Sequence, residues 1–134
     1  MVFVFDTSAL ISAHLIKNSV SAEALNRALR IGKLVFSDST INEFAEVLYR
    51  KKLDRYFVEV EREEILTVLT FKSPLIIEPS FEINVCRDPK DNKFLELAVS
   101  AKASCIVSGD IHLLELHPFQ GIPILNVADF QKDF

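Results

Sequence analysis

The sequence contains little glycine, proline or cysteine, and it has no long apolar run. Three Gly and five Pro among 134 residues indicate long regular elements joined by short turns, and they exclude collagen-like and low-complexity chains. No run of apolar residues approaches the roughly 18 that a membrane-spanning helix needs. Cys86 and Cys105 lie 19 positions apart without a C-x-x-C pair, which favours two reduced thiols in a cytoplasmic protein over a disulfide framework.

Basic residues are also few: the chain has 15 Lys and Arg against 19 Asp and Glu, which gives a formal net charge of −4. This balance argues against wrapping of duplex DNA, although it still permits nucleic acid to bind at a local basic patch. The first residues, Met1 to Asp6, lack the basic region of a signal peptide. What the chain does contain is 49% hydrophobic residues, with eleven Phe, which excludes disorder and predicts a single domain over residues 1–134.

Short apolar runs alternate with helical patterns along the whole chain. Such alternation predicts right-handed βαβ crossovers and a mostly parallel sheet covered on both faces. We therefore expect a three-layer α/β/α domain with four to five strands. Strands are predicted at 2–5, 34–36, 75–77, 105–107 and 122–125. Helices are predicted at 8–16, at 20–31, from residue 40, within 54–71, from 89 or 91, after 110 and near 128–130.

Four acidic residues are expected at one edge of this sheet. Asp6 directly follows the first predicted strand, and Asp110 follows the strand at 105–107 after Ser108 and Gly109. Glu43 and Asp91 stand at the starts of predicted helices, which face the same edge. Ligands of open α/β sheets bind outside the carboxyl ends of the strands, where the strand order reverses. This edge is therefore the expected functional site.

Each acid also has a purely structural interpretation. Asp6 can cap the helix that begins near Ser8. Thr40 and Glu43 fit a capping box in which Glu43 reaches back to the Thr40 amide. The run Asp88-Pro89-Lys90-Asp91 fits a helix start with an N-cap acid and an early proline, and Asp110 can end its strand in a turn.

Taken together, the four carboxylates point to a bound cation. Four such groups in one crevice repel one another and raise each other's pKa unless a cation lies between them. Oxygen ligands without a His/Cys cluster suit Mg²⁺ or Mn²⁺ better than zinc. Such an ion can bind a phosphodiester and activate water. The functional hypothesis is metal-dependent hydrolysis of a phosphodiester.

The same residues carry a resemblance to a known family. Four segments resemble the acidic motifs of PIN-domain ribonucleases, nearest to the VapC-like toxins of toxin–antitoxin pairs. The likeness extends over essentially the whole chain, including the closing segment 122–130. The four segments are Val4-Phe5-Asp6-Thr7-Ser8, Ser39 to Leu48 with Glu43, Asp88 to Ala98 with Asp91, and Ile106-Val107-Ser108-Gly109-Asp110.

The resemblance implies an Mg²⁺- or Mn²⁺-dependent endoribonuclease with an RNA substrate. It further implies a possible antitoxin partner and a homodimer, in a PIN-like α/β/α fold. Ser108 stands where the family more often has Thr, and the hydroxyl is kept. The implied catalytic and metal-binding residues are Asp6, Glu43, Asp91 and Asp110, supported by Thr7, Ser8, Ser108, Asp88 and Asn92.

Several charged residues near these motifs have two open interpretations. A basic cluster can be the end of a helix, where the helix dipole stabilises positive charge. It can equally be a rim that binds the phosphates of RNA. The acidic run 59–64 is expected to be a solvated helix face. The basic cluster consists of Arg50, Lys51 and Lys52 with Lys90 and Lys93.

Three other functions share the α/β class. A non-catalytic binding module for RNA or protein stays the main alternative. A receiver-like phosphotransfer domain needs an acid beside Asp6, and Asp54 does not follow a strand. A phosphatase of the haloacid dehalogenase type needs a second acid where Ser8 stands.

Overall fold

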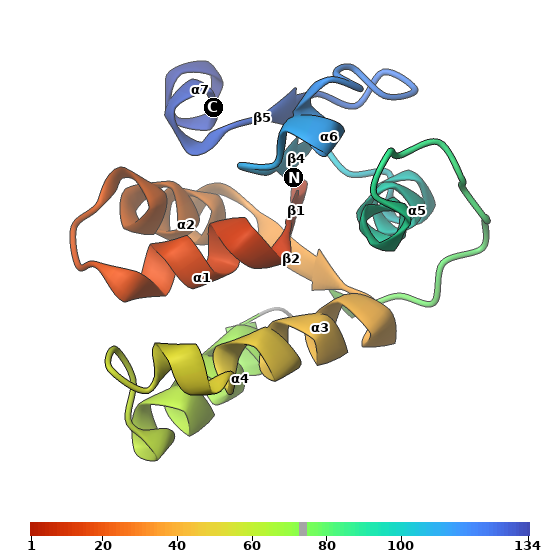
Figure 1. Cartoon of the computed structure of the whole chain (residues 1–134). Coiled ribbons are helices and arrows are strands. Elements are labelled where there is room, and N and C mark those ends of the chain that lie inside the picture. The colour runs from red at the N-terminus through yellow and green to blue at the C-terminus, as the bar shows by residue number, and fades with distance from the viewer. Residues whose placement is uncertain (73–74) are drawn as a thin grey trace.

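The computed structural model describes residues 1–72 and 75–134, and these residues build an α/β/α fold (Figure 1). Every strand pair in the sheet is parallel. The strands are β1 (Val2–Phe5), β2 (Lys33–Phe36), β3 (Leu75–Ile76), β4 (Cys105–Val107) and β5 (Ile124–Leu125). The helices are α1 (Thr7–Leu15), α2 (Val20–Ile31), α3 (Asp38–Leu48), α4 (Glu59–Lys72), α5 (Asn92–Ala101), α6 (Ile111–Leu114) and α7 (Val127–Asp133), with 3-10 turns η1 (Lys51–Leu53) and η2 (Pro89–Asp91).

The strand order β3-β2-β1-β4-β5 places the change of direction between β1 and β4. From β1 the chain moves outward through β2 to β3, and it then crosses to β4 and β5 on the other side. The register pairs Phe5 with Val107, so both strands end at the same edge. Asp6 and Ser108 therefore emerge side by side at the switch point of the sheet.

Side chains on the sheet alternate between two apolar cores, as a sheet covered on both faces requires. Phe3 and Phe5 face a core shared with α1, α2 and α7, whereas Val4 faces a core built largely by α5. Figure 1 shows α5 on one side of β1 and the α1–α2 pair on the other. The expected three-layer, mostly parallel sheet is confirmed, with five strands.

Both α1 and α3 begin at side-chain N-caps. Asp6 caps α1 by accepting from the Ala9 amide, as expected. The expected capping box of Thr40 and Glu43 is wrong, because α3 begins two residues earlier than predicted. Ser37 is the N-cap and Thr40 occupies the third position of the helix, with each side chain bonded to the other's backbone amide. Glu43 is thereby left without a capping role.

Other boundaries also differ from expectation. Residues 54–58 are not helical, because η1 ends at Leu53 and α4 begins only at Glu59. The last strand contains Ile124 and Leu125, since Ile122 forms an antiparallel bridge with Phe119 instead. The final helix is longer than the predicted turn and runs over Val127–Asp133.

Candidate metal and nucleic-acid site

Asp6 is held at the bottom of the site by three donors. Its Oδ1 accepts from the Ala9 amide at 2.8 Å and from the Ser8 hydroxyl at 3.0 Å. Its Oδ2 accepts from the hydroxyl of Ser108. The residue is only 3% exposed, and burial raises its pKa although these donors oppose the rise. The carboxylate is therefore oriented but poorly solvated.

Ser108 links the two strand-end acids. Its hydroxyl donates to Asp6 and accepts from the backbone amide of Asp110 at 2.9 Å. Asp110 caps α6 by accepting from the His112 amide at 2.8 Å. The turn interpretation of Asp110 is thus confirmed, and the same turn brings its carboxyl group near Asp91 and Asp6.

The pKa of Asp91 is strongly raised by its surroundings. The value reaches about 7, first because of burial and then because of the neighbouring Asp110, Asp88 and Asp6. The preceding loop is fixed to α5 by Asn92. Its side-chain oxygen accepts from the amides of Val85 and Cys86, at 3.1 and 2.9 Å. Asn92 thus fixes the position of the loop that leads to Asp91.

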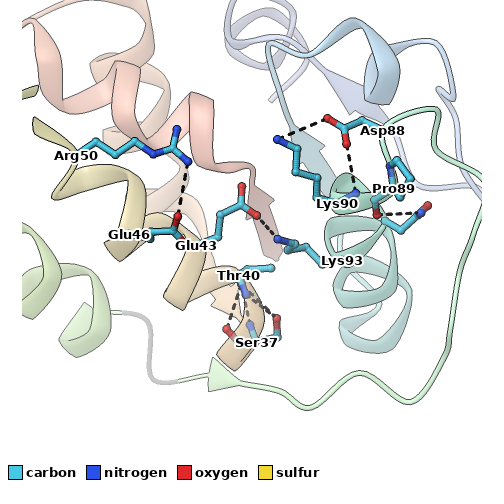
Figure 2. Close-up of polar contacts among 10 residues, drawn as sticks. Ser37, Thr40, Glu43, Glu46, Arg50, Asp88, Pro89, Lys90 and Lys93 are labelled. Carbon is cyan, nitrogen blue, oxygen red and sulfur yellow. Dashed lines mark hydrogen bonds and ion pairs between the residues drawn. The ribbon is translucent and has the colours of Figure 1, made fainter. Parts of the chain in front are cut away.

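Asp88 and Glu43 complete the acidic set. Asp88 caps η2 by accepting from the Lys90 amide at 3.3 Å, as expected. Glu43 reaches from α3 to an ion pair with Lys93 on α5, shown in Figure 2. Both side chains of this pair are 22% exposed, and the contact joins α3 to α5.

One pocket collects these acids from separate elements. It has a volume of about 430 Å³ and opens at the carboxyl edge of the sheet. We call it the acid pocket. Its polar lining comprises Asp6, Thr7, Ser8, Ser12, Glu43, Arg50, Lys52, Asp88, Lys90, Asp91 and Asp110.

Some sequence-predicted residues lie outside the acid pocket. Ser108 and Asn92 are buried. Ser108 donates to Asp6, whereas Asn92 bonds to the backbone of the loop before Asp91. Lys93 lines a neighbouring hollow instead. Lys51 is exposed and lines neither the acid pocket nor that neighbouring hollow.

Arg62 is a residue whose role sequence reasoning missed. It belongs to the acidic run 59–64 that was expected to be solvated, yet it is 6% exposed. Its guanidinium donates to the carbonyl oxygens of Leu48 and Arg50 and to Asp54. Arg62 therefore secures the segment that carries Arg50 and Lys52 into the acid pocket. A lone Arg among Glu residues gave no distinguishing signal.

The donor set of the acid pocket fits a hard divalent cation. Among residues 1–72 and 75–134, no three Asp, Glu, His or Cys side chains already form a group that could hold a metal ion. Within the same residues, two buried oxygens lack a hydrogen-bond partner, Asp91 Oδ2 and Thr7 Oγ1. An unpartnered buried carboxylate oxygen is costly, and a cation among oxygen ligands relieves that cost.

These features define an α/β domain with an acidic crevice at the switch point of a parallel sheet. A family model described as PIN domain matches residues 2–112, and the chain belongs to the PIN-domain family. It is also similar to an uncharacterized protein, MJ1680, of Methanocaldococcus jannaschii. The two are 32% identical over an alignment of 123 residues that covers 84% of this chain and 73% of the relative.

Membership of the family defines the general character of the site. PIN domains are generally nucleases that bind RNA and typically use divalent metals, which agrees with an oxygen-lined acid pocket. In the described part of the chain, no helix is both long enough and apolar enough to span a membrane.

Proposed function

We propose that this chain is an Mg²⁺- or Mn²⁺-dependent endoribonuclease. The observation that carries the proposal is the convergence of Asp6, Glu43, Asp91 and Asp110 on one pocket from four separate elements. The pKa of Asp91 is raised to about 7, first by burial and then by the neighbouring Asp110, Asp88 and Asp6. Clustered carboxylates of this kind are destabilising alone and become favourable when they share a cation.

The proposed roles divide between the acids and their neighbours. Asp6, Glu43, Asp91 and Asp110 would hold the ion, which when bound supplies Lewis-acid activation of water and stabilises the leaving oxygen. Ser108 and Ser8 orient the Asp6 carboxylate by donating hydrogen bonds. Asn92 fixes the loop before Asp91. Thr7 and Asp88 line the same pocket.

The substrate in this proposal is RNA, held by cations at the rim. Arg50, Lys52 and Lys90 line the acid pocket, and Lys93 lies in the adjoining hollow. They bring positive charge to a phosphodiester although the chain as a whole is acidic. Lys51 is exposed and stays a weaker candidate for the same role.

A finer part of the proposal concerns partners. We propose that the chain is the toxin of a toxin–antitoxin pair and acts as a homodimer, as its resemblance to VapC-like toxins implies. Support comes from apolar side chains left in solvent on α4, where Val60, Val68 and Phe71 are 67%, 43% and 86% exposed. Exposed apolar groups grouped on one element favour a protein partner.

The test is RNA cleavage by purified variants in Mn²⁺. We expect Asp6→Asn, Asp91→Asn and Asp110→Asn to lose at least about 10²-fold in rate, because each removes a charge from the set that holds the activating ion. The matched control is Asp129→Asn, an exposed acid on α7 away from the acid pocket. Cleavage retained by Asp91→Asn would contradict the proposal.

Binding of the ion is tested separately by thermal unfolding with added Mn²⁺. A ligand that binds only the folded state stabilises it by about 2.7 kcal/mol at a hundredfold excess over Kd. We expect a saturable rise for the wild type and its loss in Asp91→Asn. RNA binding that is undiminished in chelator, without cleavage of any RNA, would favour the non-catalytic binding module. The ion pair in which Lys93 neutralises Glu43 supports this alternative.

A further inference from the structure

The ion pair between Glu43 and Lys93 lies on the boundary between two hollows. The first is the acid pocket. The second, of about 390 Å³, we call the side hollow. Glu43, Arg50 and Lys90 line both, whereas Lys93 lines only the side hollow. The lining of the side hollow consists of Ser39, Asn42, Glu43, Glu46, Arg50, Lys90 and Lys93.

Glu43 therefore pairs with Lys93 while it also lines the acid pocket. Figure 2 shows its carboxylate extending from α3 toward the Lys93 ammonium on α5. Asp6, Asp91 and Asp110 share with Glu43 the acid pocket that would receive a divalent cation. A carboxylate that turns to ligate an ion in that pocket gives up at least part of its interaction with Lys93.

The cations of the side hollow form a suitable surface for a phosphodiester. Arg50 is paired with Glu46 at 3.8 Å and Lys90 with Asp88 at 3.9 Å, and both cationic side chains are well exposed, at 48% and 74%. Such exposed pairs are weak and exchange readily. Lys93 is the most enclosed cation of the three, at 22% exposed, so it gains most from a new anionic partner.

We infer that Lys93 exchanges partners during the reaction cycle, pairing with Glu43 in the metal-free protein and with a substrate phosphate in the side hollow once Glu43 binds the metal ion. This inference rests on the proposed function and deepens it. Metal binding thereby exposes a phosphate-binding group, and the scissile strand extends from the acid pocket into the side hollow. Lys93 also competes with the metal ion for Glu43.

Thermodynamic linkage predicts the direction in which metal affinity and RNA affinity change if this exchange occurs. If Lys93 competes for Glu43, removing its charge strengthens metal binding, and metal binding in turn strengthens RNA binding through Lys93. A lysine that only fixes the two helices would have the opposite effect, because its loss would disorder Glu43 and weaken metal binding. The two roles are therefore separable without any measurement of catalysis.

The first experiment measures Mn²⁺ affinity by calorimetry for the wild type, Lys93→Gln, Glu43→Gln and the double variant. We expect Lys93→Gln to bind Mn²⁺ more tightly than the wild type by about fivefold, within the usual range of coupling between sites. In the Glu43→Gln background the same substitution should have no effect. Lys33→Gln is the control, because it removes one charge at the opposite edge of the sheet, at the start of β2.

The second experiment measures binding of a fluorescein-labelled single-stranded RNA dodecamer in EDTA, where cleavage is absent. Glu43→Gln releases Lys93 and should raise RNA affinity by about fivefold, whereas the double variant should lose this gain. Lys93→Arg keeps the charge and should behave as the wild type in both experiments. Thermal unfolding of each variant establishes that it is folded.

The outcomes separate this inference from the proposed function. Tighter Mn²⁺ binding by Lys93→Gln that depends on Glu43 supports the exchange. Unchanged or weaker Mn²⁺ binding by a folded Lys93→Gln protein overturns it while the metal site stands. Absence of Mn²⁺ binding by the wild type overturns the proposed function and this inference together.

Discussion

At the scale of single residues, the acids of the site combine a structural role with a functional one. Asp6 and Asp110 each cap a helix, and Asp88 caps a 3-10 turn. The cap at Asp110 uses Oδ1, whereas at Asp6 Oδ1 forms the cap and Oδ2 accepts from the hydroxyl of Ser108. Asp91 differs because its side chain makes no cap hydrogen bond at the start of α5. No cap hydrogen bond therefore offsets the free-energy cost of placing the Asp91 carboxyl group among the other acids.

The raised pKa of Asp91 predicts a pH dependence of stability in the metal-free protein. With a pKa of about 7 in the folded state and about 3.9 when unfolded, Asp91 holds a proton in the native state that the unfolded chain releases. Its contribution to the free energy of unfolding is full below about pH 4 and is lost as pH rises through about 7. In EDTA, the wild type should lose stability over this range relative to Asp91→Asn.

Urea denaturation at pH 5 and pH 8 measures this difference, with Asp129→Asn as an exposed acid control. The advantage of Asp91→Asn over the wild type should be greater at pH 8 than at pH 5. Parallel pH profiles for the two proteins would contradict the raised pKa of Asp91. Saturating Mn²⁺ at pH 8 should reverse the order of stability, because only the wild type retains the full ligand set.

At the scale of elements, local patterns predicted which strand ends meet better than they predicted individual side-chain contacts. The apolar runs ending at Phe5 and Val107 marked two parallel strands, so the meeting of Asp6 with the Ser108–Asp110 turn followed from topology. The predicted start of α3 differs from the observed one because Ser37 and Thr40 are both good caps, and only the fold selects between them. The Glu43–Lys93 pair spans 50 positions, a distance at which no local pattern carries information.

The connection between α3 and α4 depends on Arg62. Its Nε donates to Leu48 O at 2.7 Å, and its Nη2 donates to Asp54 Oδ1 at 3.0 Å. The guanidinium also lies 5.5 Å from the centre of the Tyr49 ring. The Arg62 side chain thus hydrogen-bonds to the carboxyl end of α3 and to the turn that follows it.

Replacement of Arg62 by Met should lower the free energy of unfolding by about 2 kcal/mol, the usual value of hydrogen bonds from a charged donor. Methionine retains most of the apolar volume of the arginine stem, so the loss reports the polar contacts. Urea denaturation checks this, with Arg30→Met on the exposed face of α2 as the control. Equal stability of Arg62→Met and the wild type would show that water replaces these contacts without cost.

At the scale of the whole molecule, an acidic chain binds an anionic polymer in the proposed function. With a net charge of −4, long-range attraction is absent, and binding depends on the few cations at the site. Arg50, Lys52 and Lys90 line the acid pocket, while Lys93 is paired with Glu43 in the metal-free protein. The salt dependence of RNA binding should therefore be shallow.

Each phosphate neutralised on a single strand contributes about −0.7 to the slope of log K against log salt concentration. Three available cations predict a slope of about −2 for the RNA dodecamer in EDTA, and Lys90→Gln should reduce its magnitude by about 0.7. Fluorescence anisotropy between about 50 and 200 mM KCl measures it. Lys33→Gln, which lies far from the pocket, should keep the wild-type slope. A much steeper slope in the wild type would place additional phosphate contacts elsewhere on the molecule, whereas a slope near zero would exclude the basic rim as the surface that holds RNA.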